Sequence, residues 1–215
     1  WWTRFYNKRK MKNKIKFIYF DVGGVVIKDF SGTNKWEELQ NGLGLESSQF
    51  EEFINFFEGY EPQICVGLDI ETLVPKLKEK FNLNLPDSYS SLMDFVNRFE
   101  RNDSIIKVLE KAKEKYKIGL LTNMYPNMLD EIVKKDLIPK TDWDTVIDSS
   151  IVNLRKPQKE IFELATKKAN VNPNEILFVE NGKKHVEAAK EYGWQTFLYD
   201  SSNLEKASED LLNLL

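Results

Sequence analysis

The sequence contains very little cysteine or histidine: Cys65 and His185 are the only residues of their kinds. One cysteine cannot form a disulfide within the chain. This is typical of proteins in a reducing compartment, so we expect a cytoplasmic protein. We interpret Cys65 as a small buried side chain rather than a nucleophile. A single histidine excludes a histidine-paired catalytic triad anywhere except around His185.

Long apolar runs and an excess of charge of one sign are also missing. No apolar run approaches the ~18–20 residues of a membrane-spanning helix, so we expect no membrane span. The 31 basic and 34 acidic residues nearly balance, which argues against a nucleic-acid partner. Residues 1–14 are the exception, because they are basic and contain no acid. We expect a disordered or non-native head there. A membrane-surface arm is the alternative, since Trp1, Trp2 and Phe5 are interfacial residue types.

Apolar runs rich in β-branched and aromatic residues alternate with helical patterns along much of the chain. Such runs indicate strands buried on both faces of a parallel sheet. The predicted strands cover residues 15–21, 116–123, 144–150, 175–181 and 194–200. Helical patterns separate them from residue 100 onward, which predicts a doubly wound α/β fold with a Rossmann-like sheet.

Residues 30–99 break this alternation. They contain amphipathic helical patterns over 48–60, 69–83 and 91–99, and Ser48 and Glu51 have the spacing of a capping box. No strand pattern stands out among them. We therefore predict a core domain formed by residues 15–29 and 100–215, with a smaller helical unit of residues 30–99 inserted after the first strand.

Polar residues stand at the carboxyl ends of three predicted strands and at the start of one predicted helix. They are Asp21, Thr122, Asn123, Lys156, Glu180 and Asn181. In open α/β sheets, ligands bind beyond the carboxyl ends of the strands. We therefore expect these side chains to converge on one cleft, although each alone would be an ordinary capping or surface residue.

Four segments give the chain a resemblance to a known family. In order and spacing, "FDVGGVV", "LLTN", "RKP" and "ILFVENGKKHVEAAKEYGWQT" resemble the four motifs of the haloacid dehalogenase (HAD) superfamily. The first motif is most similar to the D-x-G-[GN]-V branch, near the amino-terminal phosphatase domain of epoxide hydrolases and bacterial sugar-phosphate phosphatases. The helical unit corresponds to the family's cap. The resemblance implies a phosphatase that uses Mg²⁺ and acts on a small phosphorylated metabolite, with a sugar phosphate favoured.

The resemblance also implies catalytic roles. Asp21 would be the nucleophile and would form an aspartyl-phosphate, which water then hydrolyses. Thr122 would donate a hydrogen bond to the phosphoryl group, and Asn123 would help to bind it. Lys156 would neutralise negative charge on Asp21 and on the phosphoryl oxygens. Gly24 has two interpretations: close approach of its backbone to the phosphate, as part of the substrate site, or a role in the turn alone.

A Mg²⁺ site is implied at the same place. The metal would take oxygens from Asp21, the backbone carbonyl of Gly23 and the carboxylate of Glu180, and Asn181 would offer a neutral oxygen. The cation would offset the repulsion between the anionic nucleophile and the anionic substrate.

Two positions depart from the family's usual pattern. The family places a second aspartate, the general acid and base, two residues after the nucleophile, and here that residue is Gly23. General acid–base catalysis contributes ~10²–10⁴-fold, so we expect turnover to depend steeply on the leaving group. Asn181 replaces a second acid and should weaken Mg²⁺ binding. Two alternatives stay open: a catalytically impaired binding or regulatory protein, and a metal-free haloacid dehalogenase. The sequence identifies neither the substrate nor the oligomeric state.

Overall fold

The computed structural model describes residues 14–215. The predicted head therefore lies outside the described residues, apart from Lys14. Within them, five parallel strands form one sheet in the order β5-β4-β1-β6-β7. The strands are β1 (Phe17–Phe20), β4 (Lys117–Thr122), β5 (Thr145–Asp148), β6 (Ile176–Glu180) and β7 (Gln195–Leu198). The first strand thus lies at the centre of the sheet, and the predicted α/β class is confirmed.

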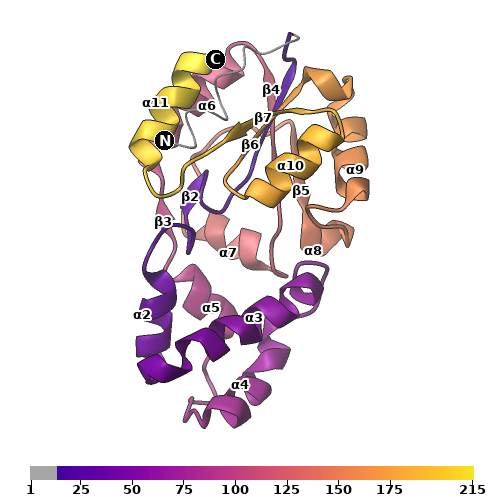
Figure 1. Cartoon of the computed structure of the whole chain (residues 1–215). Helices are drawn as coiled ribbons and strands as arrows, with labels where there is room; N and C mark the ends of the chain where they lie inside the picture. The colour runs from indigo at the N-terminus through magenta and orange to yellow at the C-terminus, as the bar shows by residue number, and fades with distance from the viewer. Residues whose placement is uncertain (1–13) are drawn as a thin grey trace.

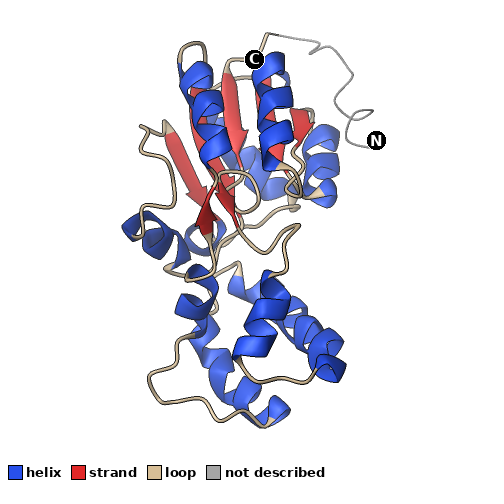
Figure 2. Cartoon of the chain, turned by 90° about the vertical axis from the view of Figure 1, so that its left-hand side faces the viewer, coloured by secondary structure: helices blue, strands red, loops and turns tan. Residues whose placement is uncertain are grey.

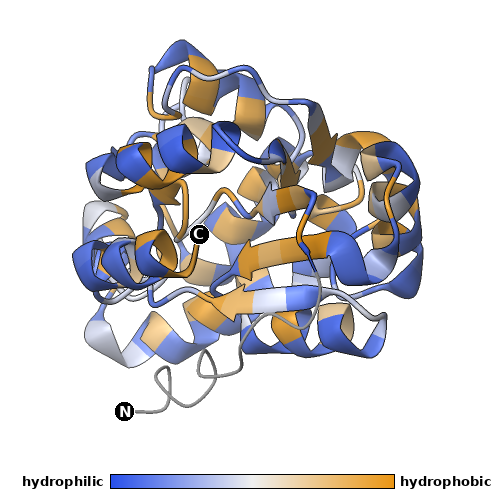
Figure 3. Cartoon of the chain, turned by 90° about the horizontal axis from the view of Figure 1, so that it is seen from above, coloured by the Kyte–Doolittle hydropathy of each residue, from blue (hydrophilic) through white to orange (hydrophobic). Residues whose placement is uncertain are grey.

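Helices cover both faces of this sheet (Figure 2). In β1, Phe17 and Tyr19 pack on one face and Ile18 and Phe20 on the other, as the two-residue period of a strand requires. The first face is covered by α9 (Lys159–Ala169) and α10 (Lys183–Glu191). The second is covered by α6 (Ile106–Lys113), α7 (Met128–Lys134) and α11 (Leu204–Leu214). Figure 3 shows the apolar strands lying between these helices.

A helical insert follows β1. It contains α2 (Lys35–Gly42), α3 (Phe50–Ile64), α4 (Val74–Phe81) and α5 (Ser91–Val96), and no strand occurs within residues 30–99. Short strands β2 (Ile27–Lys28) and β3 (Glu100–Arg101) pair antiparallel at its two ends, a pairing too short for the sequence pattern to reveal. Figure 1 shows the insert beyond one edge of the sheet. Its status as a separate domain stays a prediction.

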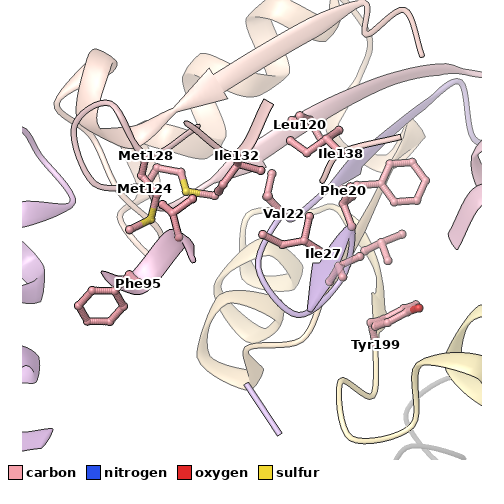
Figure 4. Close-up of a cluster of buried hydrophobic side chains, with 14 of the residues drawn as sticks. Phe20, Val22, Ile27, Phe95, Leu120, Met124, Met128, Ile132, Ile138 and Tyr199 are labelled. Carbon is pink, nitrogen blue, oxygen red and sulfur yellow. The ribbon is translucent and has the colours of Figure 1, made fainter. Parts of the chain in front are cut away.

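Aromatic side chains form the core of the insert. The rings of Trp36 and Phe95 lie 5.6 Å apart between centroids, and those of Phe57 and Phe95 lie 5.3 Å apart. This core is continuous with the core on one face of the sheet. Figure 4 shows part of it, from Phe20 and Leu120 of the sheet to Met124 and Phe95. The insert is therefore packed against the sheet domain rather than tethered by a linker.

The predicted capping box at Ser48 and Glu51 is wrong. A 3₁₀ turn, Ser47–Gln49, precedes α3, and the reciprocal capping bonds join Glu46 and Gln49 instead. Glu46 is the residue with extended backbone, at φ −73° and ψ 147°, so it occupies the capping position. Ser48 is already inside the turn. Among all the described helices, none is long and apolar enough to cross a membrane.

Candidate active site

Asp21 is the first residue after β1, whose four residues are all buried. Its backbone N–H donates to the carbonyl of Val179 at 2.9 Å, which extends the pairing of β1 with β6 by one residue. Its Oδ1 accepts a hydrogen bond from the backbone N–H of Val22 at 2.8 Å. The strand and the turn thus fix this carboxylate at the centre of the carboxyl edge of the sheet.

Lys156 places an ammonium group between two carboxylates. Its Nζ lies 2.9 Å from Asp21 Oδ1 and 2.6 Å from Glu180 Oε2, and its side chain is fully buried. The same Nζ lies 5.3 Å from the centre of the Phe178 ring, within the range of a cation–π contact. Burial acts to lower the pKa of Lys156, but the two carboxylates outweigh burial and raise it. The lysine is therefore a fixed positive charge.

The two carboxylates differ in their electrostatics. Burial and the nearby Glu180 raise the pKa of Asp21 to about 7, although Lys156 opposes both. Burial also acts on Glu180, but Lys156 and His185 hold its pKa well below the usual range. His185 Nδ1 lies 3.3 Å from Glu180 Oε2, at an angle that makes no hydrogen bond. The second oxygen, Oε1, accepts from the N–H of Gly182 at 2.7 Å. The environment thus raises the pKa of Asp21 and lowers that of Glu180.

Asn123 holds the backbone of Lys156. Its Oδ1 accepts from the N–H of Lys156 at 2.8 Å, and its Nδ2 donates to the carbonyl of Lys156 at 3.0 Å. These reciprocal bonds connect the end of β4 to the loop that carries the lysine. The sequence predicts that Asn123 binds the substrate. In the structure its amide group positions Lys156, although the residue also lines the cavity described next.

A cavity of about 550 Å³ lies between the carboxyl edge of the sheet and the insert. Carboxylates and aromatic rings are prominent among the side chains that line it. From the sheet domain come Asp21, Gly23, Asp29, Asn123, Lys156, Glu180 and Asn181, and from the insert come Trp36, Phe57, Glu58, Glu61, Phe95 and Phe99. The predicted convergence at one cleft therefore holds for Asp21, Asn123, Lys156, Glu180 and Asn181 as a matter of position.

Thr122 ends β4, next to β1, and is 1 % exposed. Its Oγ1 is a buried atom with no hydrogen-bond partner among the described residues. An unsatisfied buried hydroxyl costs about 1–3 kcal/mol, so such a group needs an explanation. Thr122 does not line the cavity itself. Its hydrogen bond to a phosphoryl oxygen therefore stays a prediction.

Comparison with known proteins decides the family. The family model of the haloacid dehalogenase-like hydrolases matches residues 15–193 of this chain. This chain belongs to that family. The resemblance drawn from the sequence motifs is thereby confirmed at the family level, and the protein is a hydrolase. The narrower branch stays a prediction.

The similar HAD proteins include different activities. The D-ribitol-5-phosphate phosphatase of Bacteroides thetaiotaomicron is 25% identical over 191 residues, which cover 85% of this chain and 91% of the relative. The (S)-2-haloacid dehalogenase of Pseudomonas sp. strain YL is 24% identical over 202 residues, with 85% and 81% covered. A HAD family enzyme of B. thetaiotaomicron, solved with magnesium and inorganic phosphate, superposes with a TM-score of 0.70 at 22% identity and covers 87% of this chain and 95% of its own.

Gly24 and Asn181 are in contact in this HAD hydrolase. Gly24 has φ +71°, and a Cβ at that position would lie 2.2 Å from Asn181 Nδ2. The glycine is therefore required both by the turn and by the close approach of the amide. Gly24 lines a neighbouring hollow rather than the cavity of Asp21. Its substrate-binding role stays a prediction.

The donor set fits a Mg²⁺ ion that completes its shell with substrate and water. Among the described residues, no three histidine, cysteine, aspartate or glutamate side chains lie close enough to hold a metal alone. Mg²⁺ usually binds one or two carboxylates together with substrate phosphate and waters. Asp21, Asn181 and the Gly23 backbone, which line one cavity, offer such oxygens. Both carboxylate oxygens of Glu180 already accept hydrogen bonds, one from Lys156 and one from Gly182. Direct coordination of Mg²⁺ by Glu180 therefore stays a prediction.

Asp29 is a candidate functional residue that the sequence analysis missed. It lines the cavity next to Gly23, and its carboxylate approaches the α-carbon of that glycine. Its Oδ1 accepts from the N–H of Ser31 at 2.8 Å. No family motif points to this residue, which lies in the segment that leads from β2 into the insert. The available signal was Gly23 itself, since a missing side chain leaves room for another.

Proposed function

We propose that this HAD hydrolase is a phosphatase that uses Mg²⁺ and acts on a small phosphorylated metabolite through an aspartyl-phosphate on Asp21. The observation that carries the proposal is the fully buried ammonium of Lys156, 2.9 Å from Asp21 and 2.6 Å from Glu180. A buried cation against a candidate nucleophile provides a site for developing negative charge. The similarity to a D-ribitol-5-phosphate phosphatase, over most of both chains, supports the same reaction class.

The charges in the cavity favour a phosphatase over a dehalogenase. Five acids line it, namely Asp21, Asp29, Glu58, Glu61 and Glu180, and the lining contains one lysine, Lys156. A haloacid carboxylate that arrived without a metal would meet this excess of negative charge. A phosphate monoester that binds together with Mg²⁺ brings positive charge with it. The raised pKa of Asp21 agrees with a site that needs a cation to ionise its nucleophile.

Each residue then has a task in the reaction. Asp21 attacks phosphorus and is later released by water. Lys156 keeps the attacking carboxylate in place and neutralises charge, and Asn123 fixes the backbone of that lysine. The unsatisfied hydroxyl of Thr122 donates to a phosphoryl oxygen. Mg²⁺ would be held by Asp21, the Gly23 carbonyl and Asn181, and when bound it would supply further charge neutralisation.

The insert side of the cavity favours a neutral, polyhydroxylated leaving group. Trp36, Phe57 and Phe95 offer apolar ring surface, and Glu58 and Glu61 offer hydrogen-bond acceptors for hydroxyl groups. The same two acids disfavour a second phosphate or a carboxylate on the substrate. Sugar and polyol monophosphates combine these properties, so we favour them as substrates. In this arrangement the insert acts as the cap over the active site.

A substrate panel tests the proposal. Phosphate release from sugar and polyol monophosphates is measured with Mg²⁺ and with a chelator, using the Asp21→Asn variant as the inactive control. We expect turnover with the metal, and a loss of turnover with chelator or in the variant. Halide release from 2-haloacids without metal would favour the dehalogenase alternative. No turnover of either class would favour the impaired binding protein.

A further inference from the structure

Asp29 occupies the space that a side chain at position 23 would fill. A Cβ built on Gly23 would lie 2.4 Å from Asp29 Oδ2, 3.2 Å from its Cγ and 3.7 Å from its Cβ. Oδ2 is therefore the atom of the carboxylate that lies nearest to Gly23. From standard C–C and C=O bond lengths, an aspartate places its carboxyl oxygens ~2.4 Å from its own Cβ. Asp29 Oδ2 thus lies as far from this point as the oxygen of an aspartate at position 23 would.

Local structure holds the Asp29 carboxylate in this orientation. Oδ1 accepts from the N–H of Ser31 at 2.8 Å, so the other oxygen is the one directed at Gly23. The hydroxyl of Thr33 donates to the carbonyl of Asp29 at 3.1 Å and ties the same turn together. The pairing of β2 with β3 fixes the chain immediately before it. Asp29 is therefore positioned by backbone contacts, and it forms no ion pair with any of the residues that the structure describes.

Asp29 also lies at the candidate active site. It lines the same cavity as Asp21, Gly23 and Lys156. The salt bridges of this site occupy Lys156 with Asp21 and Glu180, so neither of those carboxylates is placed to carry a proton to a leaving group.

We propose that Asp29 is the proton donor and acceptor of this hydrolase, and that its carboxyl group takes from position 29 the place left empty by Gly23. The inference rests on the proposed phosphatase function. It also changes the interpretation of Gly23. Because a Cβ at position 23 would collide with the Asp29 carboxylate where it now lies, a glycine at this position makes room for Asp29 in the site.

Asp29 gives up one proton in the first half-reaction and regains one in the second. When an oxygen of Asp21 bonds to phosphorus, the bond from phosphorus to the leaving oxygen breaks and its electron pair stays on that oxygen. The protonated carboxyl of Asp29 gives its proton to this oxygen, and the alcohol leaves. Asp29, now ionised, takes a proton from the water that attacks the aspartyl-phosphate. The bond from phosphorus to Asp21 breaks, which restores both carboxyl groups and releases phosphate.

The test compares two substrates in the Asp29→Asn variant with Mg²⁺ present. One is an alkyl phosphate that the wild type hydrolyses, and the other is p-nitrophenyl phosphate, whose leaving group needs little protonation. We expect the rate of leaving-group release in the first turnover to fall by ~10²–10⁴-fold for the alkyl phosphate, and by less than ~10-fold for the aryl phosphate. Retained aryl phosphatase activity also shows that the variant is folded.

Asp69→Asn is the matched control. Asp69 makes the same kind of turn bond, from the N–H of Glu71 to its Oδ1 at 3.0 Å, but it is exposed and does not line the cavity. It should change neither rate. Gly23→Ala is a second probe that keeps Asp29 in the chain but pushes its carboxylate away, and it should give the same selective loss for the alkyl phosphate.

Other outcomes overturn the assignment. Unchanged rates in Asp29→Asn would mean that Asp29 serves only the turn. Equal losses for both substrates, together with a raised Mg²⁺ requirement, would make Asp29 a metal ligand.

Restoration can also be tested: Gly23→Asp combined with Asp29→Gly should recover alkyl phosphate turnover at least ~10-fold over Asp29→Gly alone. A wild type that hydrolyses neither substrate would refute the proposed function itself.

Discussion

Replacing Lys156 with methionine should expose the electrostatic cost of the active site. Methionine nearly preserves the volume and removes the only charge between two buried carboxylates. In the wild type, Nζ lies 2.9 Å from Asp21 Oδ1 and 2.6 Å from Glu180 Oε2, and the lysine side chain has no solvent exposure. Removing one partner of a buried ion pair typically costs about 3–5 kcal/mol, because the remaining charge is left uncompensated. We expect Lys156→Met to lower the free energy of unfolding by about that amount at pH 8.

The loss should depend on pH in a defined direction. Without the ammonium, burial and mutual repulsion raise the pKa values of Asp21 and Glu180 above those of the unfolded chain. Asp21 already has a pKa of about 7 with the lysine present. Carboxyl groups of this kind destabilise the fold once they ionise, so the penalty grows as pH rises through the raised pKa. At about pH 5, where protonation relieves the repulsion, the variant should recover part of its stability.

Urea denaturation of metal-free protein at both pH values measures this effect. Lys159→Met is the control, because Lys159 pairs with Glu163 on the surface, where the two side chains are 71% and 50% exposed. An exposed pair of this kind contributes less than ~1 kcal/mol. A loss for Lys156→Met below ~1 kcal/mol at pH 8, or a loss that is equal at both pH values, would refute the electrostatic reasoning.

Three further substitutions give separate tests. Asp21→Asn removes a carboxylate with a pKa of about 7, so it should stabilise metal-free protein by an amount that grows as pH rises from about 4 to 7 and is absent below; a pH-independent change in urea unfolding would contradict this. Thr122→Val removes a buried hydroxyl that has no hydrogen-bond partner among the described residues. The free energy of unfolding, measured by thermal unfolding, should stay equal or rise by about 1 kcal/mol, while kcat should fall ~10²–10³-fold. A destabilised, fully active variant would mean that the hydroxyl serves the fold. Asn181→Asp adds an anionic oxygen at nearly constant volume and should raise the affinity for Mg²⁺ in calorimetry; unchanged affinity would mean that Asn181 does not face the metal.

The sequence was most informative where the chain alternates between buried strands and helices. The run from Phe17 to Phe20 is apolar on both faces, and the structure places it at the centre of the sheet. The carboxyl ends of parallel strands meet at one edge of the sheet, which is why Asp21 and Glu180 could be expected at the same edge. The family resemblance implied that Lys156 would act on Asp21, because no periodicity brings the loop of this lysine to the sheet edge. Its ion pair with Glu180 was not predicted.

The rest depended on contacts between residues far from any pattern. The sequence showed Gly23 as a missing acid, whereas the structure shows its place filled by Asp29 from the start of the insert. The two-residue pairing of Ile27–Lys28 with Glu100–Arg101 is too short for any periodicity, yet it joins the two ends of the insert. Asn123 shows the same limit, because its spacing cannot reveal that both amide atoms bind the backbone of Lys156.

Detection of a phosphorylated Asp21 is the most direct test of the account. Protein mixed with a hydrolysed substrate and Mg²⁺ is quenched in acid within one turnover, digested, and analysed by peptide mass spectrometry. We expect a phosphoryl group on the peptide that contains Asp21. More of it should accumulate in the Asp29→Asn variant when an aryl phosphate is used, because hydrolysis of the intermediate then lacks its base. A substrate that is hydrolysed within one turnover while Asp21 stays unmodified in both proteins would contradict the assignment of Asp21 as the nucleophile.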